Sequence, residues 1–246
     1  MIREKLYRVQ ELHNEGGINE VARGFRDYFY YMIQDAVLPE KTYRERRADI
    51  DERWKFIEPY VDESTTLLDI GCAEGYYTIK TAEAGAFALG ADLRSERLKN
   101  AREREGYPDR VGFLKWELNP ENIQKLPNMD VILLLTVQHH WQDAFGLNAA
   151  EEMFQHVMDK CDFLIYEPPG DRPIIKSEEG TISPSQSIDF YTARLNALYG
   201  DSIEVKDVML TEFRTDKERH LQRKDPLFAI DTSGFSLKAH TDTGRE

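Results

Sequence analysis

The chain has 246 residues, enough for one sizeable core, and its 32 Lys and Arg against 45 Asp and Glu give a net charge of −13. Such an acidic protein repels phosphate backbones, which argues against nucleic acid as the default partner, although a local basic patch would still permit it. A charged N-terminus, short apolar runs and only two cysteines argue against a signal peptide, a membrane span and a disulfide framework, so we expect a cytoplasmic protein.

Residues 1–60 contain no pattern typical of a strand and predict a helical extension. Apolar side chains recur there at helical spacing, for example Phe25, Tyr28, Phe29 and Met32. We interpret them as a helix face that packs on the main domain, and a lid over the substrate is compatible with the same pattern. The sequence is thus divided into an extension, 1–60, and a main domain, 61–246.

From Thr65 onward, short apolar runs alternate with amphipathic segments, which is typical of a doubly wound α/β domain. The expected strands are 66–70, 86–92, 111–117, 130–136 and 162–167. The expected helices between them are 76–84, 95–104, 121–125 and 147–160. Strands joined through helices run parallel, so we expect a mostly parallel sheet with helices on both faces.

The C-terminal part departs from this alternation. Pro184 after Ser183 predicts a helix that begins there and runs to about Tyr199. Two apolar runs, 203–213 and 227–231, then follow without a long helix between them. They predict a C-terminal hairpin, which brings the sheet to seven strands and makes one of them antiparallel.

The most informative segment is the loop after the first expected strand, which reads Asp69, Ile70, Gly71, Cys72, Ala73, Glu74, Gly75. Glycine at 71 and 75 permits a tight turn and a close approach of the backbone to a ligand. Exposed N–H groups at the start of the following helix favour a carboxylate or a phosphate. In open α/β sheets, ligands bind at the carboxyl ends of the strands, where this loop should lie.

Acidic residues after the next two strands point to an adenosine cofactor. Asp92 ends the second expected strand, where a carboxylate can accept hydrogen bonds from both ribose hydroxyls. Glu117 and Leu118 end the third, where a carboxylate can accept the adenine amino group and an apolar side chain can stack on the ring. Dinucleotide enzymes share the ribose carboxylate, so Asp92 and the loop alone indicate only an adenosine cofactor.

Other features favour S-adenosylmethionine over NAD. The loop lacks the Gly-x-Gly-x-x-Gly spacing of dinucleotide-binding loops. Asp69 stands two residues before the first glycine, where it can hold the cofactor's ammonium directly or through water but would repel a pyrophosphate. The carboxylate after the third strand, Glu117, also fits this cofactor.

At these residues the chain resembles the class I S-adenosylmethionine-dependent methyltransferases, over roughly 54–167. The resemblance implies a Rossmann-like fold that binds S-adenosylmethionine. The residues that it assigns to the cofactor are Asp69, Gly71, Cys72, Ala73, Gly75, Tyr76, Asp92, Leu93, Glu117, Leu118 and Thr136. Ala73 departs from the family's usual middle glycine. No Asn-Pro-Pro-Tyr motif follows the fourth strand, so methylation of nucleobase or glutamine nitrogen gains no support.

Two histidines follow the fourth strand directly. Imidazole changes protonation near neutral pH, so His139 or His140 could be the general base that a neutral oxygen acceptor needs. The alternative is that one packs under the rim of the sheet and the other is solvated. Trp141 could line the acceptor pocket or pack in the core. The sequence shows no metal-binding spacing.

The leading hypothesis is methyl transfer from S-adenosylmethionine to a small molecule or a glycan, on oxygen. One alternative is an RNA-modifying methyltransferase, which only a basic cluster within 214–224 supports. The others are a noncatalytic partner subunit that binds S-adenosylmethionine and an NAD-dependent oxidoreductase. The stretch 168–183 is interpreted as a flap over the pocket, and the oligomeric state stays open.

Overall fold

The structure is a computed structural model that describes residues 49–103, 108–168, 184–211 and 225–237. The expected helices before Asp49, the flap interpreted within 168–183 from residue 169 onward, and the basic cluster within 214–224 lie outside the described residues. Within these ranges, no helix is long and apolar enough to cross a membrane.

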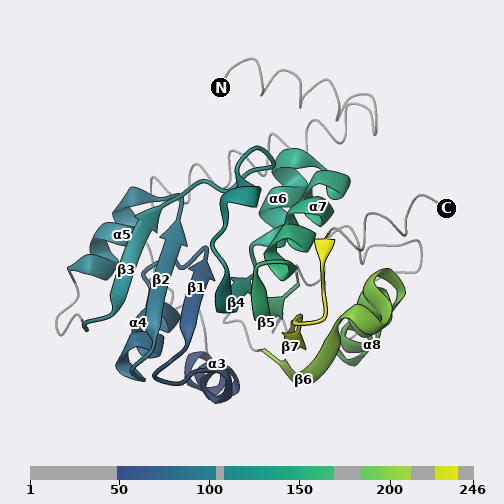
Figure 1. The fold of residues 1–246 in the computed structure, drawn as a ribbon, viewed down its shortest axis with the longest axis horizontal. Coiled ribbons are helices and arrows are strands. Elements are labelled where there is room, and N and C mark those ends of the chain that lie inside the picture. Colours follow the sequence, from purple (N-terminus) through teal and green to yellow (C-terminus); the bar gives the residue numbers. More distant parts are fainter. Residues whose placement is uncertain (1–48, 104–107, 169–183, 212–224, 238–246) are drawn as a thin grey trace, which may run out of the picture. The chain divides into compact units, whose positions relative to one another are not determined.

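Seven strands form one sheet in the order β3-β2-β1-β4-β5-β7-β6 (Figure 1). Their bounds are β1 Thr66–Ile70, β2 Phe87–Asp92, β3 Val111–Lys115, β4 Met129–Leu135, β5 Cys161–Glu167, β6 Glu204–Leu210 and β7 Pro226–Asp231. Strands β1 to β5 pair in parallel, and β7 runs antiparallel to both β5 and β6. The expected α/β fold with an antiparallel C-terminal hairpin is therefore confirmed.

Helices connect the strands and cover the sheet. Their bounds are α3 Ile50–Ile57, α4 Tyr76–Glu83, α5 Ser95–Arg102, α6 Gln138–Phe145, α7 Leu147–Met158 and α8 Pro184–Tyr199. Three short 3-10 helices, η1 Glu58–Tyr60, η2 Ile123–Lys125 and η3 Gly200–Ser202, complete the described elements. Helix α3 falls within the expected extension yet packs on the sheet, and a domain boundary at residue 60 stays a prediction.

Side chains alternate between the two faces of the sheet, as the pleat of a strand requires. On one face, Leu68 and Ile132 pack in a core that includes side chains of α6, α7 and α8. On the other, Leu67 and Leu133 pack with side chains of α3 and α4. We call these the α7/α8 face and the α3/α4 face. The edge of the sheet where the parallel strands end lies between them.

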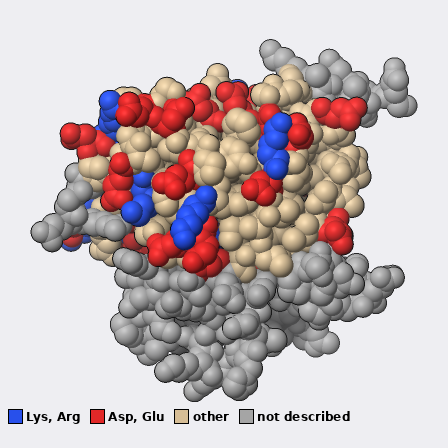
Figure 2. Space-filling model, turned by 90° about the horizontal axis from the view of Figure 1, so that it is seen from below, with Lys and Arg blue, Asp and Glu red and all other residues tan. Residues whose placement is uncertain are grey.

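The surface carries the acidic charge that the composition predicts. Figure 2 shows one side of the molecule, on which red Asp and Glu groups are spread widely. The blue Lys and Arg groups described on this side lie among them and do not gather into a basic patch. The view agrees with the net charge of −13.

Candidate functional site

The loop between β1 and α4 bends through three residues with positive φ, which are Gly71 (76°), Ala73 (50°) and Gly75 (71°). This left-handed region costs a residue with a side chain roughly 1–2 kcal/mol, so Ala73 carries strain. A Cβ on Gly75 would lie 2.4 Å from the ring of Phe113. The two glycines are therefore required by backbone conformation, and each also by a close neighbour, which is Val137 at Gly71 and Phe113 of β3 at Gly75.

Asp92, the last residue of β2, faces this loop. Its Oδ2 accepts a hydrogen bond from the N–H of Ala73 at 3.0 Å, and its Oδ1 accepts one from the N–H of Arg94 at 2.8 Å. The residue is 6% exposed, whereas the next one, Leu93, is 58% exposed. The structure thus brings a carboxylate and an accessible apolar side chain to the edge of the bend.

Asp69 lies beneath the same loop, on the α3/α4 face. Its Oδ2 accepts a hydrogen bond from the hydroxyl of Thr78 on α4 at 2.7 Å. Burial raises the pKa of Asp69 to about 7, the bond from Thr78 acts against that rise, and the charge of Asp92 adds to it. Direct contact with a cofactor would require this buried carboxylate to turn away from Thr78. Asp69 is therefore better placed to act on a cofactor electrostatically, across the loop.

The other cofactor residues assigned from the sequence lie in different settings. Glu117 is exposed beyond the end of β3, while Leu118 is buried in the core of the α7/α8 face. Tyr76 begins α4 and donates its hydroxyl to Asp51 Oδ1 at 2.8 Å. Cys72 is buried in the loop, and burial raises the pKa of its thiol far above the usual value. A role for Cys72 as a thiolate nucleophile is therefore disfavoured.

Thr136, the residue after β4, also has a positive φ, of 57°. A β-branched residue rarely adopts this conformation. Its N–H donates to the carbonyl of Glu167 at 3.2 Å, and its hydroxyl donates to the carbonyl of Leu135 at 2.6 Å. Strained backbone is frequent at functional sites, and this strain occurs at the carboxyl end of a central strand.

The two candidate catalytic histidines open α6 differently. Their ring centroids are 3.9 Å apart, with 42° between the planes. His139 is buried, and His140 is exposed. Of the pair, His140 is therefore the one accessible to an acceptor from solvent, and a general-base role stays a prediction. Trp141 is buried in the core of the α7/α8 face.

A buried ion pair that the sequence did not single out lies at the carboxyl edge of the sheet. Arg53 of α3 donates from Nη2 to Oε2 of Glu167, the last residue of β5, at 2.9 Å, and both side chains are 0% exposed. The hydroxyl of Thr211 donates to Oε1 of Glu167 at 3.0 Å. The guanidinium carbon of Arg53 lies 5.6 Å from the ring centroid of Tyr77. Because Arg53 and Glu167 are 114 positions apart, no local pattern could have paired them.

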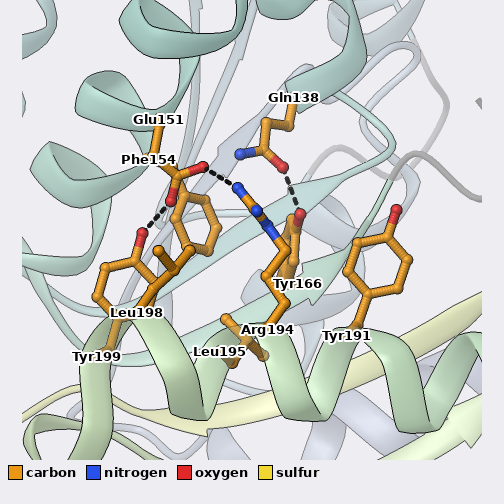
Figure 3. Close-up of a pocket in the computed structure, with 9 residues that line it drawn as sticks. All are labelled: Gln138, Glu151, Phe154, Tyr166, Tyr191, Arg194, Leu195, Leu198 and Tyr199. Atoms are coloured by element: carbon orange, nitrogen blue, oxygen red, sulfur yellow. Dashed lines mark hydrogen bonds and ion pairs between the residues drawn. The ribbon is translucent and has the colours of Figure 1, made fainter. Parts of the chain in front are cut away.

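A second Arg–Glu pair lies on the α7/α8 face (Figure 3). Arg194 Nη2 donates to Glu151 Oε2 at 2.9 Å, and the side chains are 35% and 21% exposed. Tyr199 donates its hydroxyl to the other oxygen of Glu151, and Tyr166 donates its hydroxyl to Gln138. The small cavity among them, of about 10 Å³, has room for roughly one water molecule. This cluster joins α8 to α7 and β5.

In the described ranges, no group of three or more His, Cys, Asp or Glu side chains could hold a metal ion.

Part of this chain is similar in sequence to known proteins. Residues 68–161 match a family model described as a methyltransferase domain. The O-antigen chain terminator bifunctional methyltransferase/kinase WbdD of Escherichia coli is 25% identical over 121 residues. The matched segment is 48% of this chain and 17% of WbdD, so the chain spans less than a fifth of that relative.

Solved structures share the fold. A structure of the bifunctional kinase-methyltransferase WbdD matches with a TM-score of 0.54 and 18% identity, covering 75% of this chain and 40% of that one. Magnesium protoporphyrin IX methyltransferase from Synechocystis PCC 6803, crystallised with bound SAH, matches with a TM-score of 0.51 and 12% identity. That match covers 94% of this chain and 99% of the other. At these identities the likeness concerns the fold.

Proposed function

We propose that the protein transfers a methyl group from S-adenosylmethionine to an oxygen of a small-molecule or glycan acceptor, because residues 68–161 match a methyltransferase domain model and the sheet has the order of a Rossmann-like class I fold. The observation that carries the proposal is Asp92, whose carboxylate is tied to the N–H of Ala73 at the bend after β1. Ligands of open α/β sheets bind at the carboxyl ends of the strands, which supports a role for this carboxylate in binding an adenosine ribose.

The residues at the loop fit the proposed cofactor. S-adenosylmethionine is a cation that supplies an already activated methyl group. Asp92 would bind the ribose hydroxyls, and the exposed Leu93 and Glu117 would contact the adenine. Asp69 would favour the cofactor's positive charge from beneath the loop. The chain's remaining work is to orient the acceptor and exclude water, which can account for much of a rate enhancement.

The proposed acceptor class is supported by one histidine and by the surface charge. His140 is exposed at the carboxyl edge of the sheet, where a base could take the proton of an acceptor hydroxyl. The relative named for an O-antigen and the neighbour named for a magnesium protoporphyrin act on different acceptors, so neither name selects one. The acidic surface favours such acceptors over RNA.

The two free, buried cysteines suit a reducing cytoplasm, where we place the reaction.

Calorimetric titration of the full chain with S-adenosylmethionine, S-adenosylhomocysteine and NAD tests the proposal. We expect both sulfur compounds to bind and NAD not to bind. Asp92→Ala should weaken S-adenosylhomocysteine binding at least about tenfold, because the ribose loses its acceptor. Asp201→Ala, at an exposed aspartate of η3, is the matched control and should leave binding unchanged.

Absence of S-adenosylhomocysteine binding, or equal affinity in the Asp92 variant, would overturn the cofactor assignment. Binding of NAD alone would instead favour the oxidoreductase. Salt-sensitive binding of RNA would move the acceptor from a small molecule to RNA while leaving the cofactor assignment intact.

A further inference from the structure

The buried pair of Arg53 and Glu167 joins parts of the molecule that meet at the candidate site. We propose that Arg53 is a positioning residue of the cofactor site, which holds the first turn of α4 and the ends of β4 and β5 in one fixed arrangement. The inference rests on the proposed function, since it concerns the same cofactor. It assigns a functional role to α3, which lies N-terminal to the matched methyltransferase segment.

Helix α3 contacts α4 directly after the loop. Asp51 accepts the hydroxyl proton of Tyr76 in a hydrogen bond of 2.8 Å, and Arg53 lies over the ring of Tyr77. These two tyrosines follow Gly75, the last residue of the bend with positive φ. The path by which the loop enters α4 is therefore set by α3 as well as by the loop itself.

The other end of the Arg53 contact lies on the neighbouring strands. Glu167 ends β5, and its carbonyl accepts the N–H of Thr136, the residue with left-handed backbone after β4. Its second carboxylate oxygen accepts the hydroxyl of Thr211, which follows β6. One guanidinium thus connects the helix after the cofactor loop to the strand ends that face the acceptor.

The charges beneath the site also depend on Arg53. Asp69 and Glu167 are both buried carboxylates on the α3/α4 face, and the charge of Arg53 acts against the rise that burial causes in the pKa of Asp69. An isolated buried charge is strongly unfavourable, so the carboxylate of Glu167 needs a cation at this depth. Arg53 therefore compensates the buried charge of Glu167 and, as the smallest of the effects on its pKa, favours the ionised form of Asp69 beneath the loop, where a cationic cofactor would bind.

Replacing both partners separates positioning from folding. Arg53→Met alone leaves the buried carboxylate without its arginine and is expected to destabilise the fold. In the double variant Arg53→Met/Glu167→Met, apolar side chains of similar length fill the space, and such replacements are often neutral or stabilising. We expect this variant to fold and to bind S-adenosylhomocysteine at least about tenfold more weakly than the wild type, as measured by calorimetry.

The matched control is Arg194→Met/Glu151→Met, which removes a pair of the same length from the α7/α8 face. It should leave the affinity for S-adenosylhomocysteine unchanged. Arg53→Lys keeps the charge but loses the planar group that lies over Tyr77, so it should fold and bind about threefold to tenfold more weakly.

Equal affinity in the wild type and the Arg53→Met/Glu167→Met variant would overturn the inference, and so would an equal loss in the control. If the double variant does not fold, Arg53→Lys decides the question, and wild-type affinity in that variant rejects the positioning role. Failure of the wild type itself to bind S-adenosylhomocysteine is a separate result, which rejects the proposed function as well.

Discussion

Two Arg–Glu pairs of equal length join helices to the rest of the domain on its two faces, and their surroundings differ. Arg53 and Glu167 are fully buried, whereas Arg194 and Glu151 are 35% and 21% exposed. Water screens the partly exposed pair of Arg194 and Glu151 and can solvate either partner alone, whereas a fully buried partner left alone stays unsolvated. Loss of one partner alone is therefore costly on the α3/α4 face and costs little on the α7/α8 face, although the contact is 2.9 Å long in both.

The two faces differ in the same sense beyond these pairs. On the α7/α8 face, aromatic packing helps to hold α8, with the rings of Phe154 and Tyr199 at 6.2 Å and those of Tyr199 and Phe235 at 5.8 Å between centroids. On the α3/α4 face, two buried carboxylates and a strained loop lie at the carboxyl edge. Buried charge and backbone strain thus gather on the α3/α4 side of the carboxyl edge, as is frequent where a fold carries a site.

The largest expected difference between the two pairs is in their contribution to stability, and equal contributions would contradict the contrast. Arg53→Met should lower the free energy of unfolding by about 3–5 kcal/mol, because it strands a buried carboxylate. Arg194→Met should lower it by only about 0.2–1 kcal/mol, because its partner remains accessible to water. Urea unfolding at pH 7 measures both values. Losses of similar size would show that burial does not separate the pairs.

The pH dependence of stability sharpens the contrast. The pKa of Asp69 is about 7 in the folded state against a usual 3.8, so the contribution of its neutral form is full below about pH 4 and is lost as pH rises through 7. Asp69→Asn removes this loss. Relative to the wild type, the variant should gain on the order of 2–3 kcal/mol in free energy of unfolding between pH 5 and pH 8.

Asp159, at the end of α7, provides the opposite control. Burial raises its pKa, but the hydrogen bonds from the N–H of Leu237 and from Lys160 lower it more, so the net pKa is below the usual value. Its contribution is therefore present above pH 4 and lost as pH falls. Asp159→Asn should lose stability relative to the wild type as pH rises from 3 to 5. Parallel pH profiles for the two variants would contradict the assigned environments.

The smallest expected difference concerns two glycines with positive φ. Gly75 and Gly200 have φ of 71° and 51°, but an added Cβ meets the ring of Phe113 only at Gly75 and has open space at Gly200. Alanine at either position introduces backbone strain, and at Gly75 overpacking should add about 1–2 kcal/mol. Thermal and urea unfolding of both variants measure the difference. Equal losses in free energy of unfolding would mean that the Phe113 ring moves aside without an energetic cost.

Local signals were sufficient for much of the fold. The apolar run at β1 has the expected bounds, and α8 runs from Pro184 to Tyr199 as its capping residues predict. Helix α6 was not expected, because eight residues that include two histidines, two glutamines and an aspartate show no clear apolar period. The helix after β2 ends at Arg102, two residues before the expected end, as helix termini depend on contacts beyond the local pattern.

The site divides in the same way. Gly71, Gly75 and Asp92 could be selected from the sequence because neighbouring residues indicate turns and the ends of strands. Arg53 could not, because an arginine in a charged helical segment looks like a surface residue until the fold buries it. The sequence by itself determined the α/β class, a mostly parallel sheet of seven strands and the bend after β1. Only the tertiary structure decided which charges lie beneath that bend, because burial and pairing over 114 positions depend on the packing of the whole domain.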